Sequence, residues 1–247
     1  MKKVLIASIL LTPLLFGCHK EPGINVQKSS TATHAKTINC SPGNTNNEYD
    51  EGGAIHNECL LAVSGYLGLE TLPGSSLAAG IENYMYTTYS FSIDLDPGVI
   101  QSDVEDYIAN GMSAFIDPES VEGEAINSLI NMFTPTYMSS NSYCDARLDI
   151  LAFESNITGN EDLTTSEKTA ILLFSSTLRH SLYFWEERSE GNNEVMDARL
   201  TGTALADAIG TVVGLFYSDA NTLWGQLKEA AVIGAMWSAI YDYVMNA

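Results

Sequence analysis

Residues 163–188 read LTTSEKTAILLFSSTLRHSLYFWEER, and this stretch is the strongest indication of the fold. Thr164 and Glu167 stand three positions apart, the spacing of a capping box, in which two side chains satisfy backbone N–H groups at the start of a helix. Apolar residues then recur every three or four positions, as one face of a helix requires. They are Ile171, Phe174, Leu178, Leu182 and Trp185. The stretch therefore predicts a long helix with a broad apolar face, which needs a surrounding core.

The same helical period extends outward in both directions. The further helices that it predicts lie over 54–70, 97–115, 117–133, 144–156, 195–217 and 220–245. Only residues 83–96 alternate as a strand does, and a single strand would have no partner, so we interpret them as extended or helical packing. The predicted fold class is all-α: one irregular bundle of about seven helices, forming an acidic domain over residues 51–247.

Small residues recur along the last two predicted helices, which we expect to form a hairpin over 195–245. They include Gly202, Ala206, Gly210 and Gly214 in the first helix, and Ala231, Ala235 and Ala239 in the second. Small faces let two helix backbones approach closely, either as a buried hairpin or as a pair that inserts into a membrane. The membrane alternative is typical of pore-forming and bacteriocin-like proteins. Charged residues such as Asp207 leave no uncharged run of about 18 residues, which favours the buried hairpin.

The first seventeen residues, MKKVLIASILLTPLLFG, have the layout of an export signal. Lys2 and Lys3 precede an apolar segment that is shorter than the roughly 20 residues a membrane-spanning helix needs. The residues Leu15-Phe16-Gly17-Cys18 resemble the lipobox of bacterial lipoproteins. The resemblance implies that residues 1–17 are removed as a signal peptide. It also implies that the Cys18 thiol receives a diacylglycerol and that the new N-terminus is acylated.

Residues 18–50 are rich in Ser, Thr, Asn, Gly and Pro and poor in apolar residues. Such a segment cannot bury enough surface to fold alone, so we predict a lipidated flexible tether. Two or more acyl chains hold a protein firmly on a bilayer, and the lipid bilayer is therefore the expected partner of acylated Cys18. The expected location is the cell envelope, on the outer membrane by a lipid anchor, either periplasmic or surface-exposed.

The charge of the chain argues against a role in nucleic-acid binding. Removal of Lys2 and Lys3 with the signal leaves 9 basic against 31 acidic residues, a net charge of −22. Such a surface repels phosphate backbones and anionic headgroups, whereas it can attract cations or basic partners. We expect no nucleic-acid partner, and an unknown protein or glycan as the ligand of the domain.

Three cysteines remain once Cys18 is lipidated. In an oxidising compartment Cys40, Cys59 and Cys144 allow one disulfide and leave one thiol, and the sequence does not choose among the three pairings. Cys59 lies in a helical apolar pattern, which predicts simple burial.

Two sets of residues are weak candidates for metal ligands. Asp94, Asp96 and Glu105 occupy the first, third and twelfth places of an EF-hand loop, but Val99 stands where the glycine is needed. Asp96 before Pro97 is equally typical of a helix start. His56 and Cys59 share a helix face, but the Pro-Cys-x-x-Cys of zinc deaminases is missing. We expect no cofactor.

No nucleophile stands in a catalytic motif. Ser64 in AVSGY lacks the first glycine of G-x-S-x-G, and it lies within a helical pattern. His180 could pair with the thiol of Cys59 or Cys144 only through the fold, and a partly buried, hydrogen-bonded histidine is the simpler expectation. The C-terminal half, with SSTLRHSLYFW at 175–185, resembles uncharacterised secreted proteins of the Bacteroidota, a resemblance that implies no activity.

These observations favour a membrane-anchored envelope lipoprotein that is a non-enzymatic binding or structural module. One alternative is a membrane-active factor that uses the 195–245 hairpin. The other is a hydrolase or metal-binding protein with a site assembled from dispersed residues.

Overall fold

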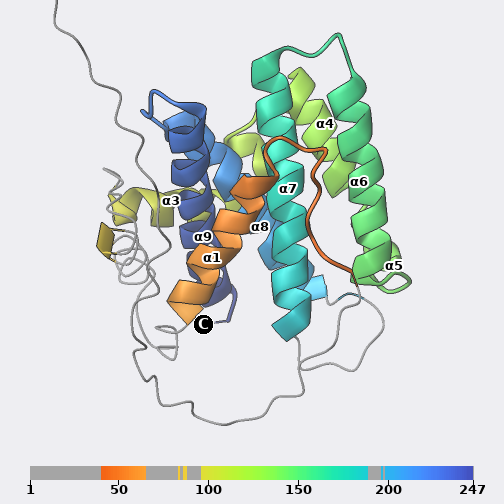
Figure 1. The fold of residues 1–247 in the computed structure, drawn as a ribbon. Helices are drawn as coiled ribbons and strands as arrows, with labels where there is room; N and C mark the ends of the chain where they lie inside the picture. The colour runs from red at the N-terminus through yellow and green to blue at the C-terminus, as the bar shows by residue number, and fades with distance from the viewer. Residues whose placement is uncertain are drawn as a thin grey trace, which may run out of the picture. The chain divides into compact units, whose positions relative to one another are not determined.

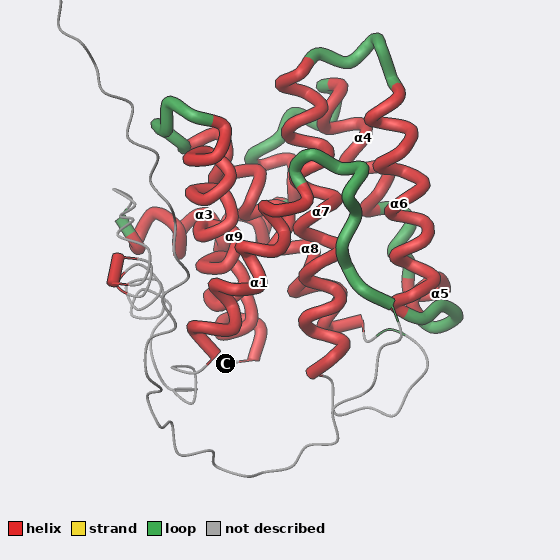
Figure 2. Tube along the Cα trace, in the orientation of Figure 1, coloured by secondary structure: helices red, strands yellow, loops and turns green. Residues whose placement is uncertain are grey.

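The computed structural model is all-α, as the sequence predicts (Figures 1 and 2). It describes residues 40–64, 83, 86–87, 96–188, 196 and 198–246. Within these ranges the bounded elements are eight α-helices and one 3-10 helix, and there is no strand. Their bounds are α1 Asp50–Ser64, α3 Pro97–Asn110, η1 Met112–Ala114, α4 Val121–Ile130, α5 Pro135–Met138, α6 Tyr143–Gly159, α7 Thr165–Arg188, α8 Ala198–Tyr217 and α9 Leu223–Asn246. Most of the stretch 83–96 lies outside the described residues.

Helix α7 is the central element of the described fold. It packs against α1, α4, α6 and α8, which surround it in Figure 1. Its start confirms the predicted capping box, because Glu167 Oε2 accepts a hydrogen bond from Thr164 N at 2.6 Å and Glu167 N donates to Thr164 Oγ1 at 3.3 Å. Every residue from Thr169 to Leu182 is buried. The helix therefore buries its whole circumference over this stretch, and not one apolar face alone.

Side-chain caps fix where the other helices begin. Asp96 caps α3 by accepting from Gly98 N at 2.8 Å, as the Asp-Pro pair predicts. The helix predicted from residue 117 begins later, at Val121, because Ser120 is its N-cap and accepts from Gly123 N at 3.0 Å. Asp117 instead stabilises the preceding turn, where its Oδ1 accepts from Glu119 N at 3.0 Å.

Helices α8 and α9 pack along each other as the predicted hairpin. Glycine permits the close approach, since a Cβ at Gly214 would lie 2.8 Å from Ile233 Cβ and 2.9 Å from Ala230 Cα. One described helix, over Leu200–Tyr217, is long and apolar enough to cross a membrane by length and composition, and 72% of this stretch is buried inside the protein. The small faces predicted from the sequence thus line a packed interface between two helices.

Residues 40–49 precede α1 and run along α6 and α7 (Figure 1). Asn47 is 3% exposed and Tyr49 2% exposed, so this segment is part of the core. Asn47 Nδ2 donates to Leu172 O at 3.0 Å, and Thr169 Oγ1 donates to Tyr49 OH at 2.9 Å. Residues 40–50, which the sequence analysis includes in the tether, therefore belong to the packed domain. The preceding part of the tether, and Cys18, lie outside the described residues.

Candidate functional site

Polar side chains are concentrated in the middle of α7, the most enclosed part of the described fold. The buried polar residues of this helix include Ser175, Ser176, Thr177, Arg179, His180 and Ser181. A buried polar group destabilises a fold unless hydrogen bonds replace those it made with water. The hydrogen-bond and ion-pair partners of these side chains therefore indicate their role.

Arg179 is the centre of one polar cluster. Its guanidinium is fully buried, and Nη2 lies 2.6 Å from Asp50 Oδ1 and 3.0 Å from Glu154 Oε1. Glu154, from α6, also accepts from Asn44 Nδ2 at 2.6 Å and from Asn47 Nδ2 at 2.9 Å. One arginine and two carboxylates thus join α1, α6 and α7, and two asparagines join them to the segment before α1.

Asp50 is held in its ionised form. Burial acts to raise its pKa, but hydrogen bonds from His180, from the Asn44 backbone N–H and from Arg179 outweigh burial and lower the pKa to about 2. His180 Nε2 lies 3.1 Å from Asp50 Oδ1, and this histidine is 6% exposed. The predicted hydrogen bond of His180 is confirmed, and the residue is more completely buried than the partial burial that the sequence predicts.

Two serine hydroxyls of α7 extend this cluster. Ser176 Oγ donates to Asp50 O at 3.2 Å, and Ser175 Oγ donates to Glu154 Oε1 at 3.1 Å. Within the part of the chain that is described, no serine hydroxyl is hydrogen-bonded to His180, which a serine nucleophile with a histidine base requires. The carboxylates are likewise engaged by Arg179 and the asparagines, so they hold elements together.

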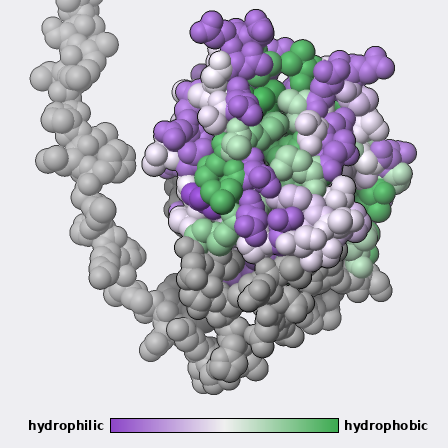
Figure 3. Space-filling view, turned by 90° about the vertical axis from the view of Figure 1, so that its right-hand side faces the viewer, coloured by the Kyte–Doolittle hydropathy of each residue, from purple (hydrophilic) through white to green (hydrophobic). Residues whose placement is uncertain are grey.

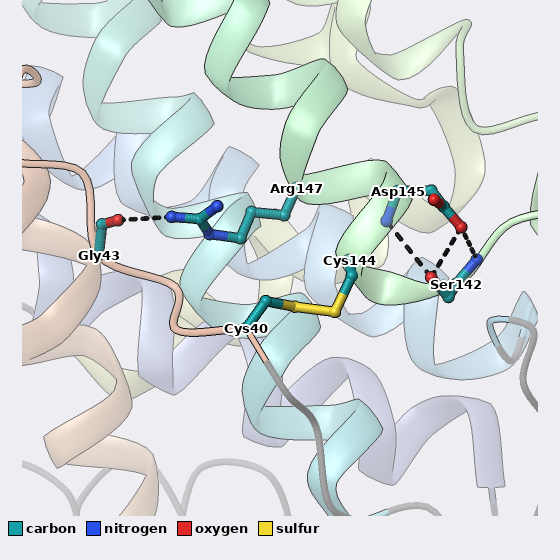
Figure 4. Close-up of a disulfide and its surroundings, with 6 residues drawn as sticks. All are labelled: Cys40, Gly43, Ser142, Cys144, Asp145 and Arg147. Carbon is teal, nitrogen blue, oxygen red and sulfur yellow. Dashed lines mark hydrogen bonds between the residues drawn. A yellow bond between two sulfur atoms is a disulfide. The ribbon is translucent and has the colours of Figure 1, made fainter.

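The structure shows which two of the three remaining cysteines form a disulfide. Cys40 and Cys144 form a disulfide with a Cα–Cα distance of 5.9 Å (Figure 4). Cys59 is outside the disulfide and is buried. Burial raises the pKa of the Cys59 thiol to about 12, which disfavours the reactive thiolate. Cys144 has no thiol to pair with His180, and the predicted burial of Cys59 is confirmed.

The disulfide attaches the segment before α1 to the start of α6. In Figure 4 it lies beside Arg147, whose Nη2 donates to Gly43 O at 3.1 Å. The capping box of Ser142 and Asp145 begins α6 directly next to it. The segment is thus held by a covalent bond at Cys40 and by hydrogen bonds from there to α1.

The described metal-ligand candidates have other contacts or are buried in the core. Asp94 lies outside the described residues, Asp96 is the N-cap of α3, and Glu105 Oε1 accepts from Gln101 Nε2 at 3.0 Å. His56 and Cys59 lie in α1, where both are buried. Among the residues that the structure describes, no group of three or more His, Cys, Asp or Glu side chains could hold a metal ion.

A second polar cluster, which the sequence pattern does not single out, is centred on Asp207 of α8. This carboxyl is fully buried, and its Oδ2 accepts from Trp185 Nε1 at 3.1 Å and from the Ser181 hydroxyl. His56 Nε2 lies 3.7 Å from the same oxygen. An acidic residue inside a helix rich in small and apolar residues is the sequence signal for this cluster, because a charge buried there requires partners from neighbouring helices.

Large apolar side chains are exposed at the turn between α8 and α9. We call Phe216, Tyr217, Leu223 and Trp224 the hairpin tip; they are 54%, 45%, 47% and 43% exposed. The turn between them satisfies its own polar groups, since Ala220 N donates to Ser218 Oγ at 3.3 Å and Gly225 N donates to Thr222 Oγ1 at 3.1 Å. The hairpin tip is thus presented by an internally bonded turn.

On another side of the domain, exposed apolar side chains are less concentrated than at the hairpin tip. Figure 3 shows the side of the domain on the right of Figure 1, where apolar side chains emerge as separate patches among hydrophilic ones. Elsewhere, Leu148 is exposed to 61% and is the one exposed large apolar side chain of α6. Scattered apolar residues of this kind are normal on soluble proteins, whereas a group of four is a candidate contact surface.

The described residues form an all-α domain whose apolar core encloses two polar clusters and whose segment before α1 is linked to α6 by a disulfide. Comparison with protein-family models, with curated proteins and with solved structures finds no match to this chain.

Proposed function

We propose that this chain is a lipid-anchored protein of the bacterial cell envelope whose helical domain acts as a non-enzymatic binding or structural module. The observation that carries the proposal is the disulfide between Cys40 and Cys144. Disulfides form and persist in oxidising compartments, so this bond supports export. It is independent of the export-signal layout of residues 1–17 and of the lipobox-like residues 15–18.

The pairing of three titratable side chains of the cluster around Arg179 supports the non-enzymatic part of the proposal. Asp50 and Glu154 are engaged by Arg179, and His180 is engaged by Asp50. A catalytic site needs polar groups that face a space for substrate. Here the interactions run between helices and from the helices to the segment that leads to the anchor, as expected of a stable scaffold.

The hairpin tip is the surface that we assign to partner binding. Tyr and Trp are enriched among the residues that carry most of the energy of protein interfaces. Lys228 lies with its Nζ 5.0 Å from the centre of the Trp224 ring, which restrains that side chain before any partner arrives. With a net charge of −22 on the mature chain, a partner with a neutral or basic surface, protein or glycan, is favoured.

The anchor is tested by replacing the acylated residue. The Cys18→Ser variant should lose both retention in the membrane fraction and incorporation of labelled palmitate. Cys59→Ala is the matched control, since it removes a different thiol and keeps the lipobox, and it should stay in the membrane fraction. A Cys18→Ser protein that still fractionates with membranes would contradict the lipid anchor.

The partner surface is tested with the Cys18→Ser chain, which is not lipidated. This protein is used as bait against envelope and host-surface extracts, beside the same chain carrying Tyr217→Ala and Trp224→Ala. A partner that binds through the hairpin tip should be lost with the double substitution and kept with Leu148→Ala, which removes an exposed apolar side chain elsewhere. Equal capture by all three proteins would exclude the tip.

A membrane-active function is the second candidate, and the length and apolarity of Leu200–Tyr217 favour it. It requires the hairpin to leave the core and to carry Asp207 into the bilayer. Release of dye from liposomes measures this directly. The anchored-module proposal expects no release at any pH, and release that depends on the hairpin would replace it.

The remaining alternative is a hydrolase or a metal protein with a dispersed site. Protein purified without chelator should then contain bound metal, or should have an activity that His180→Ala removes. Metal-free protein counts against the metal version of this alternative.

A further inference from the structure

The carboxyl group of Asp207 is buried, and no lysine or arginine among the described residues lies against it. It is 0% exposed, Oδ2 accepts from Ser181 and Trp185, and Oδ1 has no hydrogen-bond partner. In the described part of the chain no lysine or arginine forms an ion pair with it. An ionised carboxylate in such a place is strongly unfavourable unless a positive charge lies nearby.

The nearest titratable group is His56 of α1, which is also 0% exposed. Its Nδ1 lies 3.2 Å from Asn57 Oδ1, and Asn57 Nδ2 donates to His180 O at 2.7 Å. Because the amide nitrogen of Asn57 is used as a donor, its Oδ1 is the acceptor, and His56 Nδ1 carries a hydrogen. His56 Nε2 is therefore the nitrogen that points toward Asp207, at 3.7 Å from Oδ2.

The number of protons that the two side chains hold decides whether this arrangement is favourable. If His56 were neutral and Asp207 ionised, a nitrogen lone pair would face a buried carboxylate, and the core would hold an uncompensated negative charge. One proton, on the carboxyl or on Nε2, makes the pair neutral as a unit. Two protons would bury a net positive charge. We propose that His56 and Asp207 share a single proton in the folded protein, and that this proton holds α1 against the α8–α9 hairpin as a pH-sensitive latch.

Among the described residues, the side chains that face Asp207 besides His56 are neutral, whereas the His56 ring also faces a second histidine, His180. Tyr107 of α3 faces Asp207, as do Ser181 and Trp185 of α7 and Ser238 of α9. The Gly234 carbonyl and His180 face the His56 ring. Burial raises the pKa of Asp207 and lowers the pKa of His56, so that both shifts place the shared proton on the carboxyl.

The pH dependence follows from counting protons. In the unfolded chain Asp207 titrates near 3.8 and His56 near 6.5, so the two groups hold one proton between these values and none above 6.5. The folded pair keeps its proton above 6.5, so folding takes up a proton there and becomes less favourable as the pH rises. Below 3.8 the unfolded groups hold two protons, and folding becomes less favourable as the pH falls. The latch is therefore strongest between about 4 and 6.5.

The proton count is tested by comparing the full mature chain with its Asp207→Asn variant, whose amide is neutral at every pH. Between pH 6.5 and 8 the ratio of their folding constants, wild type over variant, should fall about tenfold for each pH unit. Asp219→Asn, an exposed position beside the same hairpin, should show a constant ratio. A constant ratio for Asp207→Asn as well would overturn the proposal.

A measurement on the wild-type protein covers the case in which Asp207→Asn does not fold. The carbon shift of the Asp207 carboxyl and the ring nitrogen shifts of His56 report both protonation states at pH 7. We expect either a protonated carboxyl beside a neutral ring or a carboxylate beside an imidazolium. An ionised carboxylate beside a neutral ring would contradict the shared proton.

The latch itself is tested through Cys59, which lies in α1 one turn after His56 and is 1% exposed. In the Cys18→Ser chain Cys59 is the one cysteine outside the disulfide. Its labelling rate, divided by that of the unfolded chain at the same pH, should rise with pH above 6.5. The same ratio should stay constant in Cys18→Ser with Asp207→Asn. Equal behaviour of the two chains would show that the pair does not control the docking of α1.

Discussion

Arg179 Nη2 lies 2.6 Å from Asp50 Oδ1, so a guanidinium in the middle of α7 pairs with the first residue of α1 across 129 positions of sequence. The arginine is fully buried, and its second carboxylate, Glu154, comes from α6. Removal of one member of a buried ion pair leaves the other charges without compensation. The triad therefore makes the arrangement of three helices dependent on one side chain.

Arg179→Met keeps most of the volume of the side chain and removes its charge. We expect the free energy of unfolding to fall by about 3–5 kcal/mol, because Asp50 and Glu154 are left close together without their cation. Denaturant unfolding measures the change. Arg188→Met is the control, since Arg188 is 36% exposed and its pair with Glu187 has an N–O distance of 3.7 Å, and it should lose less than about 1 kcal/mol. Similar losses in both variants would refute the central role of Arg179.

Gly214→Ala tests the close contact within the hairpin. The added Cβ would lie 2.8 Å from Ile233 Cβ and 2.9 Å from Ala230 Cα, so α8 and α9 must separate. We expect a loss of stability of about 1–3 kcal/mol, as for other overpacked cores. At Gly159, the last residue of α6, a Cβ would meet nothing within 4 Å. Gly159→Ala should therefore be neutral or stabilising by a few tenths of a kcal/mol. A Gly214→Ala protein as stable as the wild type would show that the helices can move apart.

The double variant Cys40→Ala, Cys144→Ala tests the covalent attachment of the segment before α1. The bond joins residues 104 positions apart, and removal of a disulfide from a small exported domain destabilises by about 2–5 kcal/mol. Thermal unfolding with and without reductant gives the measurement. Reductant should lower the midpoint of the wild type and leave that of the double variant unchanged. A wild-type midpoint that does not respond to reductant would contradict this expectation.

The lowered pKa of Asp50 predicts how the stability of the fold changes in acid. Its pKa in the folded protein, about 2, is below the ordinary value of 3.8. The ionised form is therefore favoured by folding, and this contribution is present above pH 3.8 and is lost as the pH falls toward 2. Asp50→Asn should reduce the steepness of the stability loss between pH 4 and 2. The exposed control Asp162→Asn should be as steep as the wild type. The free energy of unfolding is measured by circular dichroism across this pH range. Identical slopes of that free energy against pH for wild type and Asp50→Asn would contradict the lowered pKa of Asp50.

Local patterns were sufficient to predict most of the helices. The capping box of Thr164 and Glu167 and the apolar period after it place α7 correctly, because helix formation depends on neighbours three and four positions away. The small residues at Gly210 and Gly214 likewise predict a close helix pair. The start of α4 was placed too early because Asp117-Pro118 and Ser120 are both acceptable caps, and only the packed turn selects Ser120.

The sequence by itself determined the helical class, the central helix and the close pairing of α8 with α9, since these follow from spacing along one or two segments. Only the tertiary structure decided that Cys40 pairs with Cys144, that Arg179 meets Asp50 and Glu154, and that His56 faces Asp207. Each of these contacts joins segments far apart in the chain. Its partners are set by the mutual rotation and register of packed helices, which periodicity within one helix does not encode.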